Sequence, residues 1–303
     1  MRIGIMLGAQ PDPEASIEKY VRIARDVESR GFSSLWMAHI SEHDAVMAMA
    51  LAGRETEKLE VGTAVVAVQP RHPVALAQQA LTAAAYTGGR FTLGVGLAHK
   101  VVIEDSLGLS FSRPARTMRE YLEVLTPLLN GETARFRGDL YRVQSRVSVP
   151  DAPRPVPLLL AALGPMMLQI AGEMSDGTAL WMTGPKTIES HIRPNLARAA
   201  SAAGRPEPRI VAAFPIVLTE DADGARAEIA RRLAVYGQLP SYRAMLDKEG
   251  ATGPADVAIA GDERDLRDAI RRVEEAGTTD FGAVIIETEP GASERTMEFL
   301  QSL

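Results

Sequence analysis

Short apolar runs and longer stretches with a helical spacing of apolar residues alternate along the whole chain. The first apolar run is Ile3–Leu7, and the first helical spacing runs from Ile17 to Val27. It ends at Gly31, the residue type expected just after a helix. A later helical stretch, Pro73–Tyr86, begins with proline, which loses no hydrogen bond in a first turn. The pattern therefore predicts strand and helix units repeated along the chain.

Eight apolar runs have the length and composition of buried strands. They are Ile3–Leu7, Leu35–Ala38, Leu59–Val68, Phe91–Val95, Leu158–Ala161, Thr178–Met182, Ile210–Leu218 and Phe281–Ile286. Helical spacing separates almost all of them, which requires a parallel sheet covered by helices. Eight such units in 303 residues are typical of a closed (β/α)8 TIM barrel, so we expect one domain over residues 1–303. Phe136–Val149 alternates apolar and polar residues, which predicts a hairpin inserted on a loop.

Composition and charge narrow the possible partners. Apolar residues make up 46% of the chain, yet no apolar run approaches the roughly 20 residues of a membrane span. The net charge is −6 with both signs interspersed, so no basic stripe is present for nucleic acid. The absence of cysteine excludes disulfides and thiolate chemistry. The first strand leaves no room for a signal peptide, so we expect a cytoplasmic enzyme acting on a small molecule.

Histidines fall near the carboxyl ends of the expected strands, where the active sites of such barrels lie. Of the five histidines, His39, His72 and His99 are at or just past strand ends, and Ser41 follows the first of them. Histidine is the side chain best suited to proton transfer near neutral pH. His39 and His99 are therefore candidate acids or bases, with a solvated or capping role as the alternative. Arg71 and His72 precede a helix and are candidates for either a cap or a ligand contact. No spacing matches a metal-binding motif.

Two turns contain glycine in a pattern that bears on phosphate binding. Gly94-Val95-Gly96 lacks the third glycine of the dinucleotide fingerprint, so a Rossmann-type NAD site is not expected. Leu163-Gly164-Pro165 joins an expected strand to the start of a helix. Free N–H groups and the helix dipole can hold a phosphate there, although Gly164 is also explained as a simple turn residue.

Several segments taken together resemble the luciferase-like oxidoreductases. They are Gly31–Trp36, Val61–Val66 with Arg71–Gln78, Gly88–Gly96, and Ala161–Pro165 with Ala171-Gly172 and Ser175–Gly177. Gly108–Arg116 and Tyr236–Arg243 are most similar to the deazaflavin-dependent members, which use coenzyme F420. The resemblance covers nearly the whole chain and implies a TIM barrel that carries out hydride chemistry.

The resemblance also implies where the cofactor lies. Its ring would rest against the third strand, where family members have a non-prolyl cis peptide bond that maps to Ala64–Val65. The phosphate would lie at the turn that contains Gly164. The cofactor-binding residues implied are Ala64, Val65, Val66, Ala67, Gly96, His99, Leu163, Gly164, Pro165, Met182 and Thr183.

The chain departs from the sugar-phosphate dehydrogenases of this family at two positions. His39-Ile40 stands where those enzymes carry Asp-His, and His99 stands where they carry glutamate. Oxidation of glucose 6-phosphate is therefore not expected. We assign the catalytic roles to His39, in contact with the edge of the ring, and to His99, as the proton donor.

We thus expect an F420-dependent oxidoreductase that transfers hydride between the deazaflavin and a small organic substrate. Reduction is favoured because no dedicated carboxylate base is present. The alternatives are an FMN-dependent monooxygenase of the same superfamily and a flavin-binding barrel without activity. Arg71, Lys100, Arg113 and Arg116 either attract the anionic tail of F420 or are ordinary surface charges. The family pattern also favours a homodimer.

Overall fold

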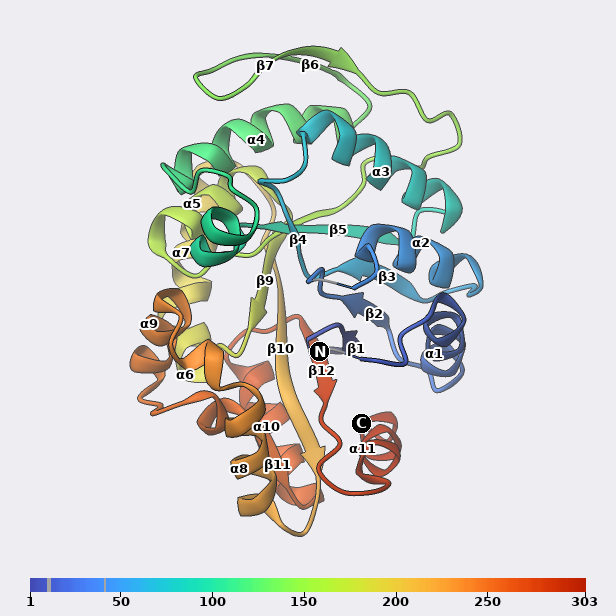
Figure 1. Cartoon of the computed structure of the whole chain (residues 1–303), viewed down its shortest axis with the longest axis vertical. Helices are drawn as coiled ribbons and strands as arrows, with labels where there is room; N and C mark the ends of the chain where they lie inside the picture. The colour runs from blue at the N-terminus through green and yellow to red at the C-terminus, as the bar shows by residue number, and fades with distance from the viewer. Residues whose placement is uncertain (10–11, 41) are drawn as a thin grey trace.

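A computed structural model describes residues 1–9, 12–40 and 42–303, so Ser41 lies outside the described residues. Within these residues eight parallel strands form a closed ring (Figure 1). They are β1 (Arg2–Leu7), β2 (Ser34–Met37), β3 (Glu60–Thr63), β5 (Phe91–Gly96), β8 (Leu158–Leu160), β9 (Gly177–Trp181), β10 (Arg209–Leu218) and β12 (Asp280–Ile285). The ring closes because β10 pairs with both β9 and β12. The predicted (β/α)8 barrel is confirmed.

Two further strands extend the same sheet. The run predicted as one strand over Leu59–Val68 is divided into β3 and β4 (Val66–Ala67), and β4 pairs with the end of β5. The strand β11 (Ile259–Gly261) pairs with the last residues of β10, beyond the point where β9 ends. It was not predicted because three residues are too short to show a period.

Helices cover the outside of the ring (Figure 1). They are α1 (Ile17–Ser29), α2 (Ala45–Arg54), α3 (Pro73–Tyr86), α4 (Pro114–Leu129), α5 (Pro165–Met174), α6 (Pro185–Thr187), α7 (Arg193–Ala202), α8 (Ala222–Arg232), α9 (Pro240–Glu249), α10 (Glu263–Glu275) and α11 (Ala292–Gln301). Four shorter helical turns are η1 (Val102–Ser106), η2 (Ile188–Ile192), η3 (Ala234–Gly237) and η4 (Pro254–Val257). Among the described residues, no helix has the length and apolar character needed to cross a bilayer.

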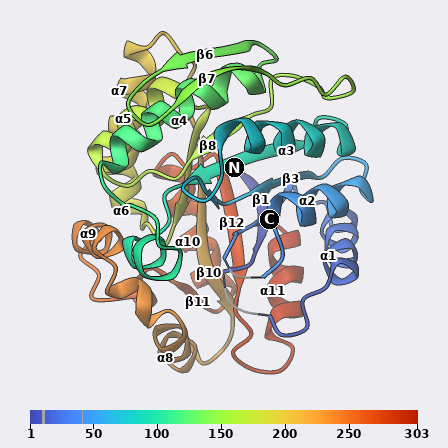
Figure 2. The same ribbon diagram turned by 45° about the horizontal axis from the view of Figure 1, so that its top comes forward.

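A hairpin is present as predicted, but it begins at Thr133, before the predicted range of Phe136–Val149. Its strands β6 (Thr133–Arg137) and β7 (Arg142–Arg146) are antiparallel and lie outside the ring, across α4 (Figures 1 and 2). The carboxylate of Glu120 on α4 accepts hydrogen bonds from three successive backbone N–H groups of the hairpin turn, at 2.7–3.3 Å. This buried carboxylate therefore anchors the hairpin to the barrel.

Alternation along the strands divides the buried side chains into two sets. The larger set packs between the strands and the helices and includes Leu35 of β2 and Leu160 of β8. The other contains their chain neighbours Trp36 and Leu159, together with Val211. Successive side chains of a strand point to opposite faces, so the strand residues of the second set, such as Trp36, Leu159 and Val211, point into the ring. The ring is thus a packed core whose two ends remain available for polar groups.

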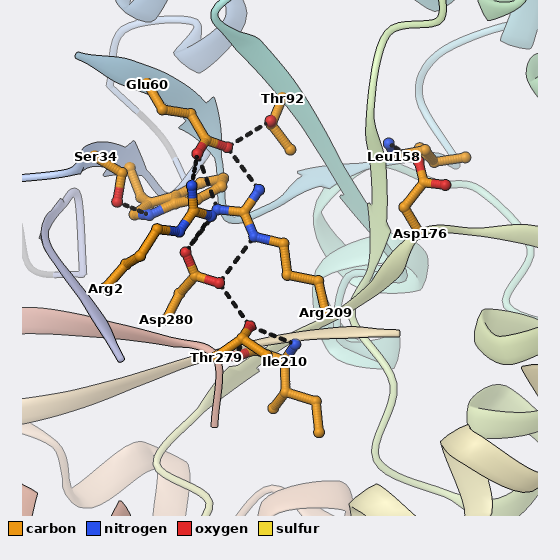
Figure 3. A network of polar contacts seen from close by, with 11 residues as sticks. Arg2, Ser34, Glu60, Thr92, Leu158, Asp176, Arg209, Ile210, Thr279 and Asp280 are labelled. Carbon is orange, nitrogen blue, oxygen red and sulfur yellow. Dashed lines mark hydrogen bonds and ion pairs between the residues drawn. The ribbon is translucent and has the colours of Figure 1, made fainter. Parts of the chain in front are cut away.

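A network of partly buried ion pairs closes the amino ends of the strands (Figure 3). Arg209, at the start of β10, donates hydrogen bonds to Asp280 at 2.7 and 2.8 Å and to Glu60 at 2.7 and 3.0 Å. Arg2 pairs with the same two carboxylates. The Arg209 guanidinium carbon lies 5.3 Å from the centre of the Trp36 ring. Two arginines balance two carboxylates at the end of the barrel that usually serves stability rather than function.

We expect protonation of Asp280 to lower the stability of the protein in acid. Burial acts to raise the pKa of Asp280, but hydrogen bonds from Arg209 outweigh burial and hold this pKa below its ordinary value. A carboxyl group with a depressed folded pKa stabilises the protein above its unfolded pKa of about 3.9, and this stability is lost as pH falls through the folded pKa. The free energy of unfolding, measured by urea titration, should decrease from about pH 5 downward, and Asp280→Asn should make that decrease shallower. An unchanged pH dependence in the variant would contradict this role.

Candidate functional site

The order of strands around the ring brings most of the predicted site residues to one end of the barrel. The strands β2, β3, β5, β8 and β9 are consecutive neighbours. Because parallel strands share a direction, the residues that follow them lie around the same rim. These residues are His39 after β2, Ala64 and Val65 after β3, Gly96 and His99 at and after β5, Leu163, Gly164 and Pro165 after β8, and Met182 and Thr183 after β9.

The third strand is interrupted by a bulge that contains a cis peptide bond between Ala64 and Val65, as predicted. Gly62 pairs with Thr92 and Val66 pairs with Val95. Between these two pairs the third strand therefore has one residue more than β5. The bulge therefore displaces the backbone of the third strand at the rim, between His39 and the end of β5.

Side-chain and backbone contacts hold the bulge in place. The hydroxyl of Thr63 donates to the carbonyl of Gly94 at 2.8 Å and accepts from its N–H at 2.9 Å, which replaces the missing ladder bonds. A Cβ atom on Gly96 would lie 2.7 Å from Cγ2 of Val65, so a side chain there would displace the bulge. The N–H of His39 donates to the carbonyl of Val65 at 3.4 Å. His39, Val65 and Gly96 are thus brought together.

His39 is held between two hydrogen-bond donors. Nη2 of Arg71 lies 3.1 Å from Nε2 of His39, and the N–H of Ala45 donates to Nδ1 at 3.2 Å. The same Arg71 nitrogen donates to Asp44 at 2.9 Å. Burial and then the charge of Arg71 lower the pKa of His39 below its ordinary value. The lowered pKa favours the neutral ring near pH 7, and a neutral imidazole accepts at one nitrogen only, so it accepts from one of these two donors at a time.

The four basic residues considered for binding an anionic tail all have acidic partners. Arg71 pairs with Asp44 at 2.9 Å, Lys100 with Glu104 at 3.6 Å, Arg113 with Asp139 at 3.4 Å, and Arg116 with Glu120 at 3.0 Å. Pairing removes most of the field that each cation would exert on a distant anion. This arrangement supports the interpretation of these residues as ordinary charges.

His99 lies at the end of a row of aromatic rings. Its ring centre is 5.9 Å from that of Tyr242, which is 5.2 Å from Tyr236, which is 6.1 Å from Trp181. Burial lowers the pKa of His99 and raises the pKa of both tyrosines, so the imidazole is the group of this row that changes charge most easily. The row connects the loop after β5 with the end of β9 and with η3 and α9.

Sequence reasoning did not assign Trp181, Tyr236 or Tyr242 to the site. Trp181 is one of only two tryptophans and ends a barrel strand, which was the available signal. Its buried Nε1–H makes no hydrogen bond of ordinary geometry within the described part of the chain, and it lies close enough to the Tyr236 hydroxyl to act on the pKa of that group. The two tyrosines come from a segment between β10 and β11, and only the folded chain brings them to the rim.

The turn after β8 leads into a helix whose N-terminus is uncapped. Gly164 occupies the N-cap position of α5, and no described side chain accepts a hydrogen bond from the first turn. The space beside Gly164 is open to the extent that the structure describes it, since a Cβ atom there would have no described neighbour within 4 Å. The start of α6, the next helix, is capped: the carboxylate of Glu249 accepts hydrogen bonds from Thr187 N–H at 2.7 Å and from Lys186 N–H at 3.2 Å. Of these two helix starts, that of α5 keeps its N–H groups available for an anion.

Met182 and Thr183 follow β9 at the same rim. Met182 is buried and adopts a positive φ of 47°, a conformation rarely occupied by residues other than glycine. The hydroxyl of Thr183 is 3.4 Å from the carbonyl of Trp181, to which it donates. The cofactor roles of Met182, Thr183 and the turn at Gly164 stay predictions.

The rim therefore combines features that fit a phosphate-bearing, ring-containing cofactor. The bulge at Ala64 and Val65, whose side chains are partly exposed, offers a surface against which a flat ring can lie, and Gly96 leaves room for the Val65 side chain behind it. The uncapped start of α5 can bind a phosphate. His99 can exchange a proton with a bound substrate.

Comparisons with known proteins agree with this arrangement. A family model described as luciferase-like monooxygenase matches residues 1–299. A putative coenzyme F420-dependent oxidoreductase of Mycobacterium tuberculosis is 28% identical, with 78% of this chain and 72% of that protein covered.

Two solved structures have the same fold. An F420-dependent secondary alcohol dehydrogenase in complex with an F420–acetone adduct has a TM-score of 0.81 at 20% identity, covering 99% of this chain and 97% of that one. The oxygenating constituent of 3,6-diketocamphane monooxygenase of Pseudomonas putida, in complex with FMN, has a TM-score of 0.78 at 15% identity, covering 99% and 96%.

Proposed function

Because the chain belongs to the luciferase-like monooxygenase family, we propose that it is an F420-dependent oxidoreductase that reduces a small organic substrate. F420 supplies or receives a hydride when bound, and the protein binds both reactants and moves a proton. The relative named as an F420-dependent oxidoreductase supports this choice of cofactor.

One observation carries the proposal. The rim places a backbone bulge at Ala64–Val65 two strands away from an uncapped helix start at Gly164, with the glycine-lined end of β5 between them. A cofactor with a flat ring and a phosphate would contact both features at once. We propose that Val65 and Gly96 support the ring and that Leu163, Gly164 and Pro165 surround the phosphate.

His39 and His99, the two histidines near the proposed ring, have different roles in the proposed reaction. His39, whose pKa is lowered by burial and by the charge of Arg71, would contact the edge of the ring as a neutral side chain. We propose that His99 gives a proton to the substrate during reduction, since burial raises the pKa of the neighbouring tyrosines and makes them weaker acids. In the reverse direction a neutral His99 would take the proton from an alcohol.

An FMN-dependent monooxygenase is the second candidate. The pairing of all four basic candidates with acids leaves the anionic tail of F420 without a dedicated partner among them. FMN carries a single phosphate, for which the start of α5 is sufficient. The FMN complex of a protein with the same fold also supports this alternative.

Titration of the apoprotein with each cofactor tests the proposal. We expect F420 to bind with a Kd at least about tenfold below that of FMN, measured by quenching of cofactor fluorescence. Reduced F420 should then be oxidised by members of a panel of enones, imines and ketones. Tighter binding of FMN would favour the monooxygenase, and binding of F420 without turnover on the panel would favour a barrel without activity.

The homodimeric state and the cytoplasmic location expected from the sequence stay predictions. Sedimentation of the purified protein, compared with the chain mass of 32.6 kDa, tests the first of them.

A further inference from the structure

We infer that His191 is a positioning residue that orients the turn at the start of α5 for binding the cofactor phosphate. Asn195 and Arg198 in turn fix the orientation of His191. This inference rests on the proposed function, because it concerns how the same cofactor would be held. His191 lies on η2, and Asn195 and Arg198 lie on α7, so all three come from the segment that follows β9 rather than from the turn itself.

The orientation of Asn195 is set by Arg198. A guanidinium group can only donate hydrogen bonds, and Nη2 of Arg198 contacts Oδ1 of Asn195. The amide nitrogen of Asn195 must therefore face the other way. There Nδ2 donates to the carbonyl of His191 at 2.7 Å and lies 3.4 Å from Nδ1 of the same residue.

Asn195 then determines which nitrogen of His191 carries the proton. Because an amide nitrogen donates, Nδ1 of His191 is the accepting atom, and the proton of the neutral ring lies on Nε2. Nε2 is 2.9 Å from the carbonyl oxygen of Leu163, to which it donates. A chain of three oriented hydrogen bonds thus runs from the surface of α7 to the turn after β8.

The contact with Leu163 controls the direction of the next N–H group. The carbonyl of Leu163 and the N–H of Gly164 belong to one planar trans peptide unit, so they point in opposite directions. With the carbonyl held against His191, the N–H of Gly164 points away from η2. Because glycine has no side chain, the space at this position is open, and among residues 1–9, 12–40 and 42–303 no side chain caps the helix that follows.

Orientation matters here because Pro165 contributes no N–H group to the first turn of α5. The N–H of Gly164 is therefore a large part of what the turn can offer an anion. If the peptide unit rotated, the carbonyl oxygen of Leu163 would face the phosphate instead and repel it. His191 excludes that arrangement by holding the carbonyl.

The variants His191→Ala and His191→Gln test this role, with Ser190→Ala as the matched control. The glutamine amide can donate from about the position of Nε2, whereas alanine cannot. Ser190 is the neighbouring residue, is exposed, and bonds only to the carbonyl of Lys186 within its own helical segment. Each protein is titrated with FMN and riboflavin, which differ by the phosphate, and with F420 and its dephosphorylated deazaflavin core.

We expect His191→Ala to raise the Kd of the phosphate-bearing cofactors about tenfold and to leave the Kd of the two dephosphorylated compounds within about twofold. His191→Gln should recover most of the affinity, and Ser190→Ala should match the wild type. Equal losses for both kinds of compound in His191→Ala would indicate general loosening of the site and overturn the inference. So would unchanged affinity for FMN and F420. A wild-type protein that binds neither cofactor would instead overturn the proposed function.

Discussion

Replacement of His99 by alanine is expected to lower the turnover number about 10²–10⁴-fold, the usual contribution of a general acid or base. His99 is the group of the aromatic row at the rim that titrates most readily, since burial lowers its pKa and raises those of Tyr236 and Tyr242. The affinity for the cofactor should stay within about twofold, because the proposed phosphate site is at a different strand end. Steady-state kinetics with reduced cofactor, combined with the fluorescence titration, separates the two quantities.

His99→Gln and the pH profile distinguish proton transfer from hydrogen bonding. Glutamine can donate a hydrogen bond but has no proton to give, so it should be about as inactive as alanine. In the wild type the rate of reduction should rise as pH falls. Burial lowers the pKa of His99 below its ordinary value of about 6.5, so the protonated, proton-donating form becomes abundant only at pH values below that. Asp105→Asn, an exposed change on the nearby helix η1, should leave both profiles unchanged. Substantial activity in His99→Gln would exclude the proton-donor role.

Replacement of Arg209 by methionine is expected to lower the free energy of unfolding by about 3–5 kcal/mol. The guanidinium group makes four hydrogen bonds to Glu60 and Asp280, and the side chain of Asp280 is only 2% exposed. Without Arg209, two carboxylates at the amino end of the barrel would share the single cation of Arg2. The cost arises from leaving a buried charge without a full partner, rather than from the attraction itself.

Urea unfolding measures this loss, with Arg271→Met as the matched control. Arg271 forms an ion pair with Asp268 one turn away on α10, but its side chain is 64% exposed. Exposed pairs contribute at most about 1 kcal/mol, so the control should be nearly as stable as the wild type. Similar losses in the two variants would show that the buried network contributes no more than a surface pair.

Much of the fold could be predicted from local patterns. The eight runs chosen for their apolar character are the eight strands of the ring, and the bounds of α3 agree residue for residue. Strands and helices impose different periods on apolar residues, and proline and glycine mark their ends. The bulge at Ala64–Val65 was expected only from the resemblance to a family, since no local pattern distinguishes it within a valine-rich run.

The candidate site was predicted less completely. His99 and the turn at Gly164 were found because they follow expected strands. Trp181, Tyr242 and His191 were not assigned roles, because their significance depends on which neighbours they meet. His191 is 28 residues from the carbonyl that it holds, and no spacing in the chain indicates that contact.

The sequence by itself determined the kind of element formed by the longer segments and the end of the barrel at which polar residues gather. Both properties follow from short-range periodicity and from the common direction of parallel strands. Only the tertiary structure decided the partners: Arg209 with Glu60, which are 149 residues apart, and Arg71 with His39 and Asp44. Such pairs depend on the closure and register of the ring. These are set by the packing of all eight strands together, so no single segment contains them.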